Sequence, residues 1–446
     1  MSSYHNYIFY RNPGKKYPVV SHGKGVYLWD KNGRKYLDGS GGACVVNIGH
    51  GVEEIKEAMI AQAEKVSFAH SSQFTSEASF ECAERICRML WAGSLNKVYF
   101  LSGGSEAVET AIKLVRQYWR DSGKPDKYKI ISRWSSFHGN TTGALSLSGH
   151  TERRKNYLPF FPHTPHVEPC YCYRCPYGLE PDSCNMHCAE ELERCICREG
   201  PESVAAFIAE PIVGAAAGAL VPLERYLERI REICDEYDVK LIADEVMTGI
   251  GRCGYNICME KWKVIPDLVV LAKGLSSGYT PLGAVVVRDE IHNAIRRGSR
   301  VFMHGHTFAQ NPLSTAVGAR VLRYIEEHDL VERSKQTGEL LFSKLQGFLD
   351  FDIVGDVRGS GLFAGIEFVQ DKKTKSCFHP SEKVNRQVTD LAMSRGLIVY
   401  PGSGGANGIE GDHILLAPPF IISEKEIDEM ISILRSAVLS TQNIIS

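Results

Sequence analysis

Two short apolar runs that each end in a charged residue constrain this chain more than any other feature of its sequence. Residues 239–243 lead into Asp244 and Glu245, and residues 268–272 lead into Lys273. Both runs have the length and β-branched content of buried strands, although periodicity alone does not separate them from short buried helices. As neighbouring parallel strands, they would place the charged side chains at their carboxyl ends, where open α/β sheets build binding sites.

A carboxylate and an amine at adjacent strand ends are what the cofactor pyridoxal phosphate (PLP) requires. Lys273 would form a Schiff base with the cofactor, and Asp244 would keep the pyridine nitrogen protonated. The alternative is that both residues are surface charges that follow two buried strands. The other motifs of the chain separate these two interpretations.

Length and composition indicate a globular protein with more than one core. At 446 residues the chain exceeds one average domain, so we expect a large domain of roughly 250 residues and a smaller one. The formal net charge of −2 gives no electrostatic case for binding nucleic acid or an anionic membrane. No apolar run approaches the ~20 residues of a membrane span, and residues 1–18 lack the apolar core of a secretory signal. We therefore expect a cytoplasmic protein whose 14 cysteines stay reduced.

A glycine-rich turn between a predicted strand and a predicted helix is a candidate anion site. Strand 98–101 runs into Ser102-Gly103-Gly104-Ser105, and a helix follows from about Glu106. Backbone N–H groups at such a turn, together with the helix N-terminus and the Ser105 hydroxyl, can hold a phosphate. A plain helix cap is the alternative. A second loop, Phe137-His138-Gly139, follows another predicted strand and offers an aromatic ring that could stack on a flat ligand or simply pack in the core.

Residues 168–197 hold seven of the fourteen cysteines and form a predicted insert. Cys172 and Cys175 have the two-residue gap of a zinc knuckle. The ligands that could complete a metal site are Cys184 with His187 or Cys188. The alternative, which we favour, is an inserted loop with reduced, packed thiols and no bound metal.

The first hundred residues contain one strand signal and two helix signals. Residues 1–25 are predicted to be an irregular arm, and residues 26–37 surround the turn 30–33 as in a hairpin. Apolar residues at helical spacing predict helices over 52–66 and 76–92.

The second half of the chain changes its pattern at about residue 328. Before that point, a strand ends in Glu210-Pro211, and a loop with His306 and Thr307 enters a helix near Pro312. After it, helices alternate with strand-rich segments. The predicted division is an N-terminal arm and small-domain segment at 1–70, a large domain at 71–327 with the insert at 168–197, and a smaller α+β domain at 328–446.

The motifs and their order identify a family. The chain resembles the class III PLP-dependent aminotransferases (ω-aminotransferases of PLP fold type I) from the hairpin GVYLWDKNGRKYLDG to the strand HILLAPPF. SGGSEAVETAIKLVRQY is similar to the phosphate loop, FHGNTTGALSLSG to the ring-stacking loop and AEPIVG to the Glu-Pro strand. DEVMTGIGRCG is similar to the pyridinium motif, LAKGLSSGYTPLGAV to the lysine loop and GHTFAQNPLS to the phosphate loop of the partner subunit. The resemblance implies an α/β large domain with a mostly parallel seven-stranded sheet between helices, plus a smaller α+β domain from the N- and C-terminal segments.

The resemblance also implies a role for each motif residue. Lys273 would be the Schiff-base lysine and proton shuttle, Asp244 the partner of the pyridine nitrogen, and Glu210 a neighbour of the lysine and the substrate. Thr307 would come from the partner subunit, so an obligate homodimer is implied. The implied cofactor-binding residues are Phe137 and Val246 on opposite faces of the ring, His138 close by, Gly104, Ser105 and Thr307 at the phosphate, and Glu210, Asp244 and Lys273.

The implied reaction is a ping-pong transamination through aldimine and ketimine intermediates. It would move a terminal (ω) amino group from an amine or ω-amino acid to an oxo acid, with pyruvate as the expected acceptor. Alternatives on the same fold are an aminomutase and a decarboxylating aminotransferase. An alternative of another class is a metal-binding or scaffold protein built on the Cys-rich insert.

The sequence departs from the family pattern at two places. Many ω-aminotransferases carry an arginine shortly before the APP motif, where it binds the substrate carboxylate, and here no arginine occurs between Arg395 and Arg435. This carboxylate clamp is therefore absent or comes from elsewhere. Arg252, in GIGRCG, is expected to be structural and not to bind substrate. Ala43 and Cys44 lie where some relatives place a large aromatic residue, which predicts a roomier pocket. The insert, with CYRCPYG, is similar to a subgroup that includes taurine–pyruvate-type enzymes.

Overall fold

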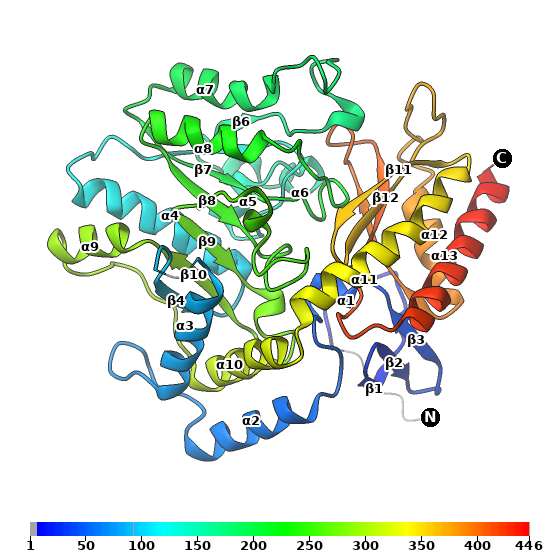
Figure 1. The fold of residues 1–446 in the computed structure, drawn as a ribbon, viewed down its shortest axis with the longest axis horizontal. Helices are drawn as coiled ribbons and strands as arrows, with labels where there is room; N and C mark the ends of the chain where they lie inside the picture. The colour runs from blue at the N-terminus through cyan, green and yellow to red at the C-terminus, as the bar shows by residue number, and fades with distance from the viewer. Residues whose placement is uncertain (1–6, 92, 446) are drawn as a thin grey trace.

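A seven-stranded sheet lies at the centre of the protein (Figure 1). The computed structural model describes residues 7–91 and 93–445, so the first six residues of the predicted arm lie outside the described residues. In spatial order the strands are β4 (Lys97–Leu101), β10 (Gly283–Val287), β9 (Leu268–Leu271), β8 (Lys240–Asp244), β7 (Val204–Ala209), β5 (Lys129–Arg133) and β6 (His166–Val167). Strand β10 runs antiparallel to both of its neighbours, and the other pairs are parallel. The sheet is therefore mostly parallel, as the resemblance implies.

The central strands are apolar throughout because both faces of the sheet are covered. In β8, Leu241 and Ala243 belong to one hydrophobic core, whereas Ile242 belongs to a second core on the opposite face. Val269 and Val270 in β9 alternate in the same way. Successive side chains of a strand point to opposite faces, so a strand between two helical layers needs a continuous apolar run. Both predicted strand runs are confirmed, and they are parallel neighbours.

Helix α4 (Gly104–Asp121) packs across β7, β8, β9 and β10 and fixes the turn that precedes it at the carboxyl ends of the strands. The other helices of this layered region are α2 (Glu53–Lys65), α3 (Glu77–Met89), α5 (Thr142–Leu147), α6 (Thr151–Arg154), α7 (His187–Glu199), α8 (Tyr226–Glu236), α9 (Asp289–Arg297) and α10 (Pro312–Glu327). Shorter turns of helix are α1 (Gly41–Cys44) and the 3₁₀ segments Leu158–Phe160, Cys172–Arg174, Cys258–Trp262, Lys273–Leu275 and Gln346–Asp350.

A small sheet joins the two ends of the chain. Its strands are β1 (Val20–Lys24), β2 (Tyr27–Asp30), β3 (Lys35–Asp38) and β13 (Leu397–Ile398). The predicted hairpin is β2 and β3, and it is confirmed. The predicted irregular arm is wrong for β1, which pairs antiparallel with β2. Because β1 is almost wholly exposed, backbone pairing holds it and no apolar alternation marks it in the sequence.

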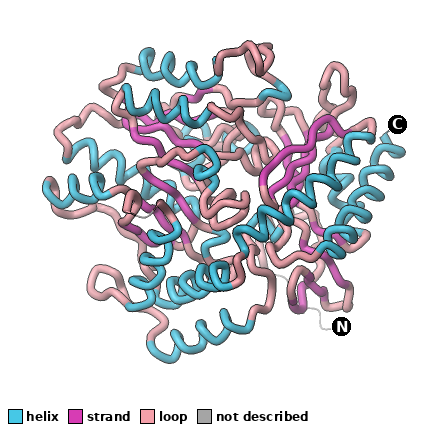
Figure 2. Tube along the Cα trace, in the orientation of Figure 1, coloured by secondary structure: helices cyan, strands magenta, loops and turns pink. Residues whose placement is uncertain are grey.

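An antiparallel sheet, covered by three helices, forms the C-terminal part of the protein, as Figure 2 shows on the right. Its strands, in spatial order, are β11 (Val354–Ser360), β12 (Phe363–Phe368), β15 (Asp412–Leu416) and β14 (Tyr400–Ser403). The helices are α11 (Leu330–Leu345), α12 (Val384–Ser394) and α13 (Glu424–Ile445). The region after residue 328 is thus α+β, whereas the proposed domain boundaries remain predictions.

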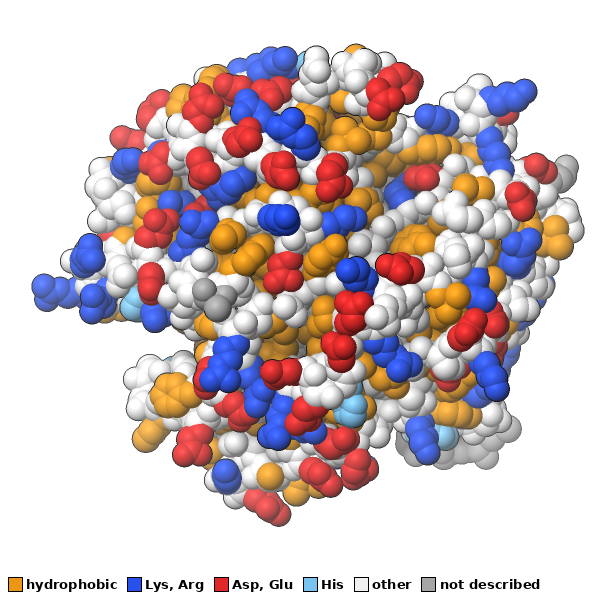
Figure 3. All heavy atoms as spheres, viewed as in Figure 1, with side chains coloured by type: hydrophobic (Ala, Val, Ile, Leu, Met, Phe, Trp, Pro, Cys, Tyr) orange, Lys and Arg blue, Asp and Glu red, His pale blue; other side chains and the backbone are white. Residues whose placement is uncertain are grey.

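The surface carries charges of both signs. On the face that Figure 3 shows, basic and acidic side chains are interspersed, in line with the small net charge. None of the helices in the described ranges is long and apolar enough to cross a membrane.

Candidate active site

The carboxyl ends of β7, β8 and β9 bring three charged residues to one cavity. Ala209 pairs with Ala243, so Glu210 and Asp244 follow at the same level, and Lys273 lies just beyond the end of β9. The cavity measures 290 Å³. Its lining residues are Val45, Ser102, Gly103, Gly104, Ser105, Phe137, His138, Gly139, Glu210, Asp244, Val246, Met247, Ala272, Lys273, Ser276, Gly278, Thr280, Pro281 and Leu282.

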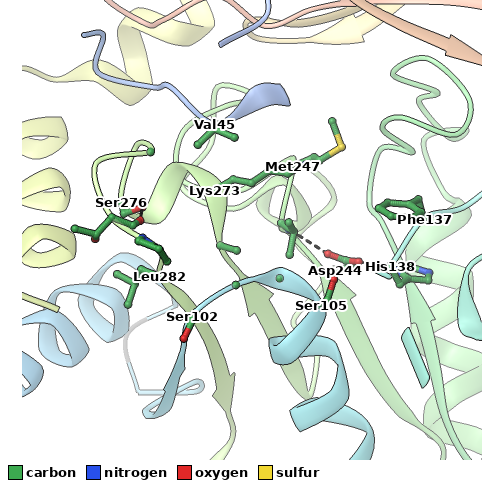
Figure 4. Close-up of a pocket in the computed structure, with 18 of the residues that line it drawn as sticks. Val45, Ser102, Ser105, Phe137, His138, Asp244, Met247, Lys273, Ser276 and Leu282 are labelled. Atoms are coloured by element: carbon green, nitrogen blue, oxygen red, sulfur yellow. Dashed lines mark hydrogen bonds and ion pairs between the residues drawn. The ribbon is translucent and has the colours of Figure 1, made fainter. Parts of the chain in front are cut away.

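Opposite walls of this cavity come from segments that are far apart in the sequence (Figure 4). Phe137 and His138 lie on one side, Ser276 and Leu282 lie on the other, and Lys273 lies between them with Val45 above it. All eight predicted cofactor residues of the chain's own site are therefore gathered here. The ninth, Thr307, is an exposed residue of the loop between α9 and α10 and does not line the cavity.

Asp244 and His138 form a buried pair. His138 Nδ1 lies 2.6 Å from Asp244 Oδ2, and the backbone N–H of Val246 donates to Asp244 Oδ1 at 3.1 Å. The exposed fractions of the two paired residues are 3% each. A carboxylate has about four acceptor sites, so Asp244 can still accept from a further donor in the cavity. A buried charge needs such partners, since burial without them is costly.

Glu210, which directly follows β7, lines the same cavity. Its Oε1 accepts from the N–H of Phe137 at 2.9 Å, and its Oε2 accepts from the N–H of Gly214 at 2.8 Å. Burial raises the pKa of the Glu210 carboxyl, His138 lowers it, and the nearby Asp244 carboxylate raises it further. Burial and the Asp244 carboxylate together favour the protonated form of Glu210.

Lys273 has a left-handed backbone conformation, with φ of +47°. This region is sparsely populated by residues other than glycine, so neighbouring contacts have to maintain it. A Cβ on Gly274 would lie 2.3 Å from Asn47 Nδ2, which shows how closely Asn47 packs on the lysine turn. Ser277 Oγ accepts from the N–H groups of Asn47 at 2.8 Å and Ile48 at 3.1 Å. The lysine is therefore held on a rigid turn.

The first turn of α4 is built to receive an anion. The helix begins at Gly104, two residues earlier than predicted, and its N-cap Gly103 has no side chain to satisfy the free N–H groups. Ser105 Oγ accepts from the N–H of Asn140 at 3.0 Å, which leaves the Ser105 hydroxyl proton available to donate. A Cβ on Gly104 would lie 3.1 Å from Val246 Cγ1, so glycine permits this close approach. Free N–H groups, a hydroxyl and the helix dipole together favour a phosphate.

Several functional positions were missing from the sequence prediction. Val45 and Met247 line the cavity, whereas Ala43 and Cys44, which were expected to shape it, are not among its lining residues. Met247 lies in the DEVMTG motif, and its position three residues after Asp244 could have indicated it. Asn47 gives no local signal, because its contacts are to residues more than 200 positions away.

Arg252 is structural, in agreement with the prediction. Its exposed fraction is 1%, and it does not line the cavity. Its Nη1 donates to the carbonyl oxygens of Leu362 at 3.0 Å and Pro418 at 2.7 Å, and its Nη2 donates to Asn47 Oδ1 at 2.7 Å. Arg252 thereby ties the C-terminal part of the chain to the segment that packs on Lys273.

The Cys-rich insert is packed against the rest of the protein. Cys170 and Cys188 are buried, and the thiols of all described cysteines are free. Within residues 7–91 and 93–445, no group of three or more His, Cys, Asp and Glu side chains is placed to hold a metal ion. The zinc-knuckle interpretation of Cys172 and Cys175 therefore has no support in the geometry.

Comparisons with known proteins agree with this arrangement. Residues 9–438 match the family Aminotransferase class-III. The uncharacterized aminotransferase YodT of Bacillus subtilis is 44% identical over 98% of this chain and 98% of its own length. The putrescine–pyruvate aminotransferase of Pseudomonas aeruginosa is 36% identical over 95% of this chain and 91% of its own length. The PLP-bound structure of an amine transaminase from an uncultivated Pseudomonas species is 34% identical, covers 99% of both chains and superposes with a TM-score of 0.91. The chain therefore belongs to the class III aminotransferases, which are PLP-dependent enzymes.

Proposed function

We propose that this aminotransferase moves a terminal amino group from an amine or ω-amino acid to an oxo acid, with pyruvate as the acceptor. The observation that carries the proposal is the juxtaposition of the Lys273 amine and the buried Asp244 carboxylate at the ends of adjacent parallel strands. The uncapped first turn of α4 opens into the same cavity, and this candidate phosphate site is independent support for the proposal.

The residues of the cavity fit PLP in their chemistry. Gly104 and Ser105 would hold its phosphate, and Phe137 and Val246 would enclose its ring. PLP, when bound, supplies an electron sink for the bonds that break at the amine-bearing carbon of the substrate. That chemistry needs a protonated ring nitrogen, and the Asp244 carboxylate would hold that proton because a close anion raises the pKa of its partner.

Each remaining residue would bind, orient or move a proton. The Lys273 Nζ atom would anchor the cofactor and, once released as a neutral amine, carry a proton to and from the substrate carbon. His138 would orient Asp244 through the 2.6 Å hydrogen bond and complete its burial. Glu210, with its raised pKa, would offer a proton or a hydrogen bond to the substrate beside Lys273.

The substrate assignment rests on two features. The first is the similarity to the putrescine–pyruvate aminotransferase, which names a terminal diamine and pyruvate as the substrates of that relative. The second is the cavity itself, in which Val45, Met247 and Leu282 provide apolar lining for the body of an amine. An aminomutase and a decarboxylating aminotransferase would use the same residues, and the experiment below separates them from an amino-transfer enzyme.

We also propose that the active unit is a cytoplasmic homodimer in which the partner's copy of Thr307 completes the phosphate site. Thr307 does not line the cavity of its own chain. Its loop presents large exposed apolar side chains, Met303 at 82% and Phe308 at 60% exposure, as expected for a surface that a second copy covers. The Phe308 ring also packs edge-on against Phe68 at 5.9 Å between ring centroids, which orders the loop.

A spectral half-reaction tests the proposal. The PLP-loaded protein is mixed, without any acceptor, with taurine, β-alanine, 4-aminobutyrate, a diamine or 1-phenylethylamine. Loss of the cofactor band with one donor and its return on addition of pyruvate support amino transfer and name the donor class. Release of carbon dioxide supports a decarboxylating enzyme. A loaded protein that no amine bleaches, but that converts a substrate without any external oxo acid, supports the aminomutase.

A further inference from the structure

The proposed acceptor is an anion, and the cavity offers it little positive charge. Among the described residues that line the cavity, Lys273 is the one lysine or arginine, and it faces the buried carboxylates of Glu210 and Asp244. A substrate carboxylate placed here without a cation would be repelled by the Asp244 carboxylate. A basic side chain next to the cavity, outside its immediate lining, would supply the missing positive charge.

Arg153, on the short helix α6, occupies such a place. Its guanidinium carbon lies 4.2 Å from the centroid of the Phe137 ring, and Phe137 lines the cavity. Arg153 is half-buried, one side chain away from the reacting groups. The guanidinium lies over the Phe137 ring, where the π system attracts it, and guanidinium N–H groups are suited to bind a carboxylate with two parallel hydrogen bonds.

The basic residues next to Arg153 in the sequence already form polar contacts, whereas the side chain of Arg153 forms no ion pair with the described residues. Arg154 donates to the carbonyl oxygen of Ser148 at 2.7 Å, and Lys155 pairs with Glu152 at 2.8 Å. Within the described part of the chain, no carboxylate oxygen lies within 4.0 Å of the Arg153 side-chain nitrogens. Burial and the charge of Arg153 lower the pKa of the adjacent His150 to about 4, so His150 is neutral at neutral pH. Arg153 thus supplies positive charge on this side of the cavity, as does Arg11.

The arginine-free segment before the APP motif packs against the helix that carries Arg153. Gly408, in that segment, has φ of +86°, and a Cβ there would lie 2.3 Å from Thr151 Oγ1. A side chain at Gly408 is therefore excluded by both conformation and space. Thr151 opens the same helix that carries Arg153, so the arginine-free segment and Arg153 lie side by side.

We infer that Arg153, stacked on Phe137, is the carboxylate-binding residue of this enzyme and selects substrates that carry a carboxylate. The inference rests on the proposed function, because it assigns a binding residue for that function's oxo acid or ω-amino acid. The carboxylate of a donor and that of an acceptor share the chemistry that Arg153 recognises.

The test uses PLP-loaded wild-type protein and three variants. Arg153→Gln removes both the positive charge and the paired N–H donors of the guanidinium, whereas Arg153→Lys keeps the charge alone. Lys155→Gln is a control that removes an equal charge from the same helix end. Calorimetric titration with propionate, which has a carboxylate but neither an amine nor a carbonyl, measures binding without turnover. Arg153→Gln should weaken propionate binding about tenfold to a hundredfold, Arg153→Lys less, and Lys155→Gln not at all.

Two comparisons of substrates show whether Arg153 binds the carboxylate of the donor or that of the acceptor. With 1-phenylethylamine as donor, a higher KM for pyruvate in Arg153→Gln assigns the residue to the acceptor. Weaker bleaching by 4-aminobutyrate, with butylamine unaffected, assigns it to the donor. Equal propionate affinity in wild type and Arg153→Gln would overturn the inference. It would also be overturned if Arg153→Gln lost bleaching by 1-phenylethylamine and butylamine equally, because neither amine has a carboxylate and such a loss indicates damage to the cofactor site. Failure of the proposed function would instead appear in the wild-type protein, which no amine would bleach.

Discussion

Asp244 and Glu245 are adjacent carboxylates, and replacing each by its amide should have opposite consequences. Glu245 turns away from the cavity. Its Oε1 accepts from the N–H of Met259 at 2.9 Å, and the Thr248 hydroxyl donates to its Oε2. Burial raises the pKa of Glu245 to about 7, although these hydrogen bonds partly offset the effect. Glu245 is therefore an ionisable group whose charge opposes folding, whereas Asp244 is held by His138 for use in the cavity.

The sign and size of the Glu245 effect follow from proton linkage. A carboxyl whose pKa rises from 4.5 in the unfolded chain to about 7 in the folded protein binds more protons when folded over that pH range. The free energy of unfolding therefore falls as pH rises from 4.5 to 7, and the penalty is complete above pH 7. At 1.36 kcal/mol per pKa unit, the full penalty is about 3 kcal/mol. Glu245→Gln does not ionise, so its stability relative to wild type should increase by that amount across the range.

Thermal unfolding of wild type and Glu245→Gln at several pH values between 5 and 8 measures this difference. With an unfolding entropy of about 2.1 cal/mol/K per residue, 3 kcal/mol corresponds to about 3 °C in a chain of this length. The midpoint of the variant relative to wild type should rise by about that much with pH, and its amino-transfer rate should be retained. Asp244→Asn is the matched variant, and it should lose about a hundredfold in amino-transfer rate. A midpoint difference that is the same at pH 5 and pH 8 would refute the reasoning.

Three further substitutions test the cavity and the proposed contribution of the partner subunit. Lys273→Ala should lose both bleaching by amines and turnover, and full turnover in this variant would remove Lys273 from the mechanism. Ser105→Ala should weaken PLP binding about tenfold to a hundredfold in equilibrium dialysis, because a hydrogen bond to a charged group is lost; unchanged affinity would exclude the hydroxyl from the phosphate site. Thr307→Val should weaken PLP binding. In a mixed dimer of Thr307→Val and Lys273→Ala subunits, the site that keeps Lys273 receives an intact Thr307 from the other subunit, so its affinity for PLP should be normal. No restoration would mean that Thr307 acts within its own subunit.

The sheet and the site residues on it could be predicted because their signals are local. The runs that became β8 and β9 are apolar on both faces, and the residues directly after them must lie at one edge of a parallel sheet. Gly104 and Ser105 follow β4 in the same way. The proximity of Asp244 and Lys273 is thus a consequence of strand direction and length, which sequence reveals.

The features that escaped prediction depend on contacts between distant segments. Strand β1 is exposed and has no apolar alternation, so only its pairing with β2 defines it. Asn47 and Ser277 meet across 230 positions of the chain, and their packing against the lysine turn has no sequence signature. The stacking of Arg153 on Phe137 likewise depends on how α6 lies against the preceding loop.

The most direct test of the central claim is to locate the covalent attachment of the cofactor. The PLP-loaded protein is reduced with borohydride, which fixes a Schiff base permanently, and is then digested and analysed by mass spectrometry. The cavity at the ends of β8 and β9 predicts that the peptide containing Lys273 carries the reduced cofactor, and that Lys273→Ala carries none. Attachment to another lysine, or an unlabelled Lys273 in protein that has bound PLP, would contradict the account.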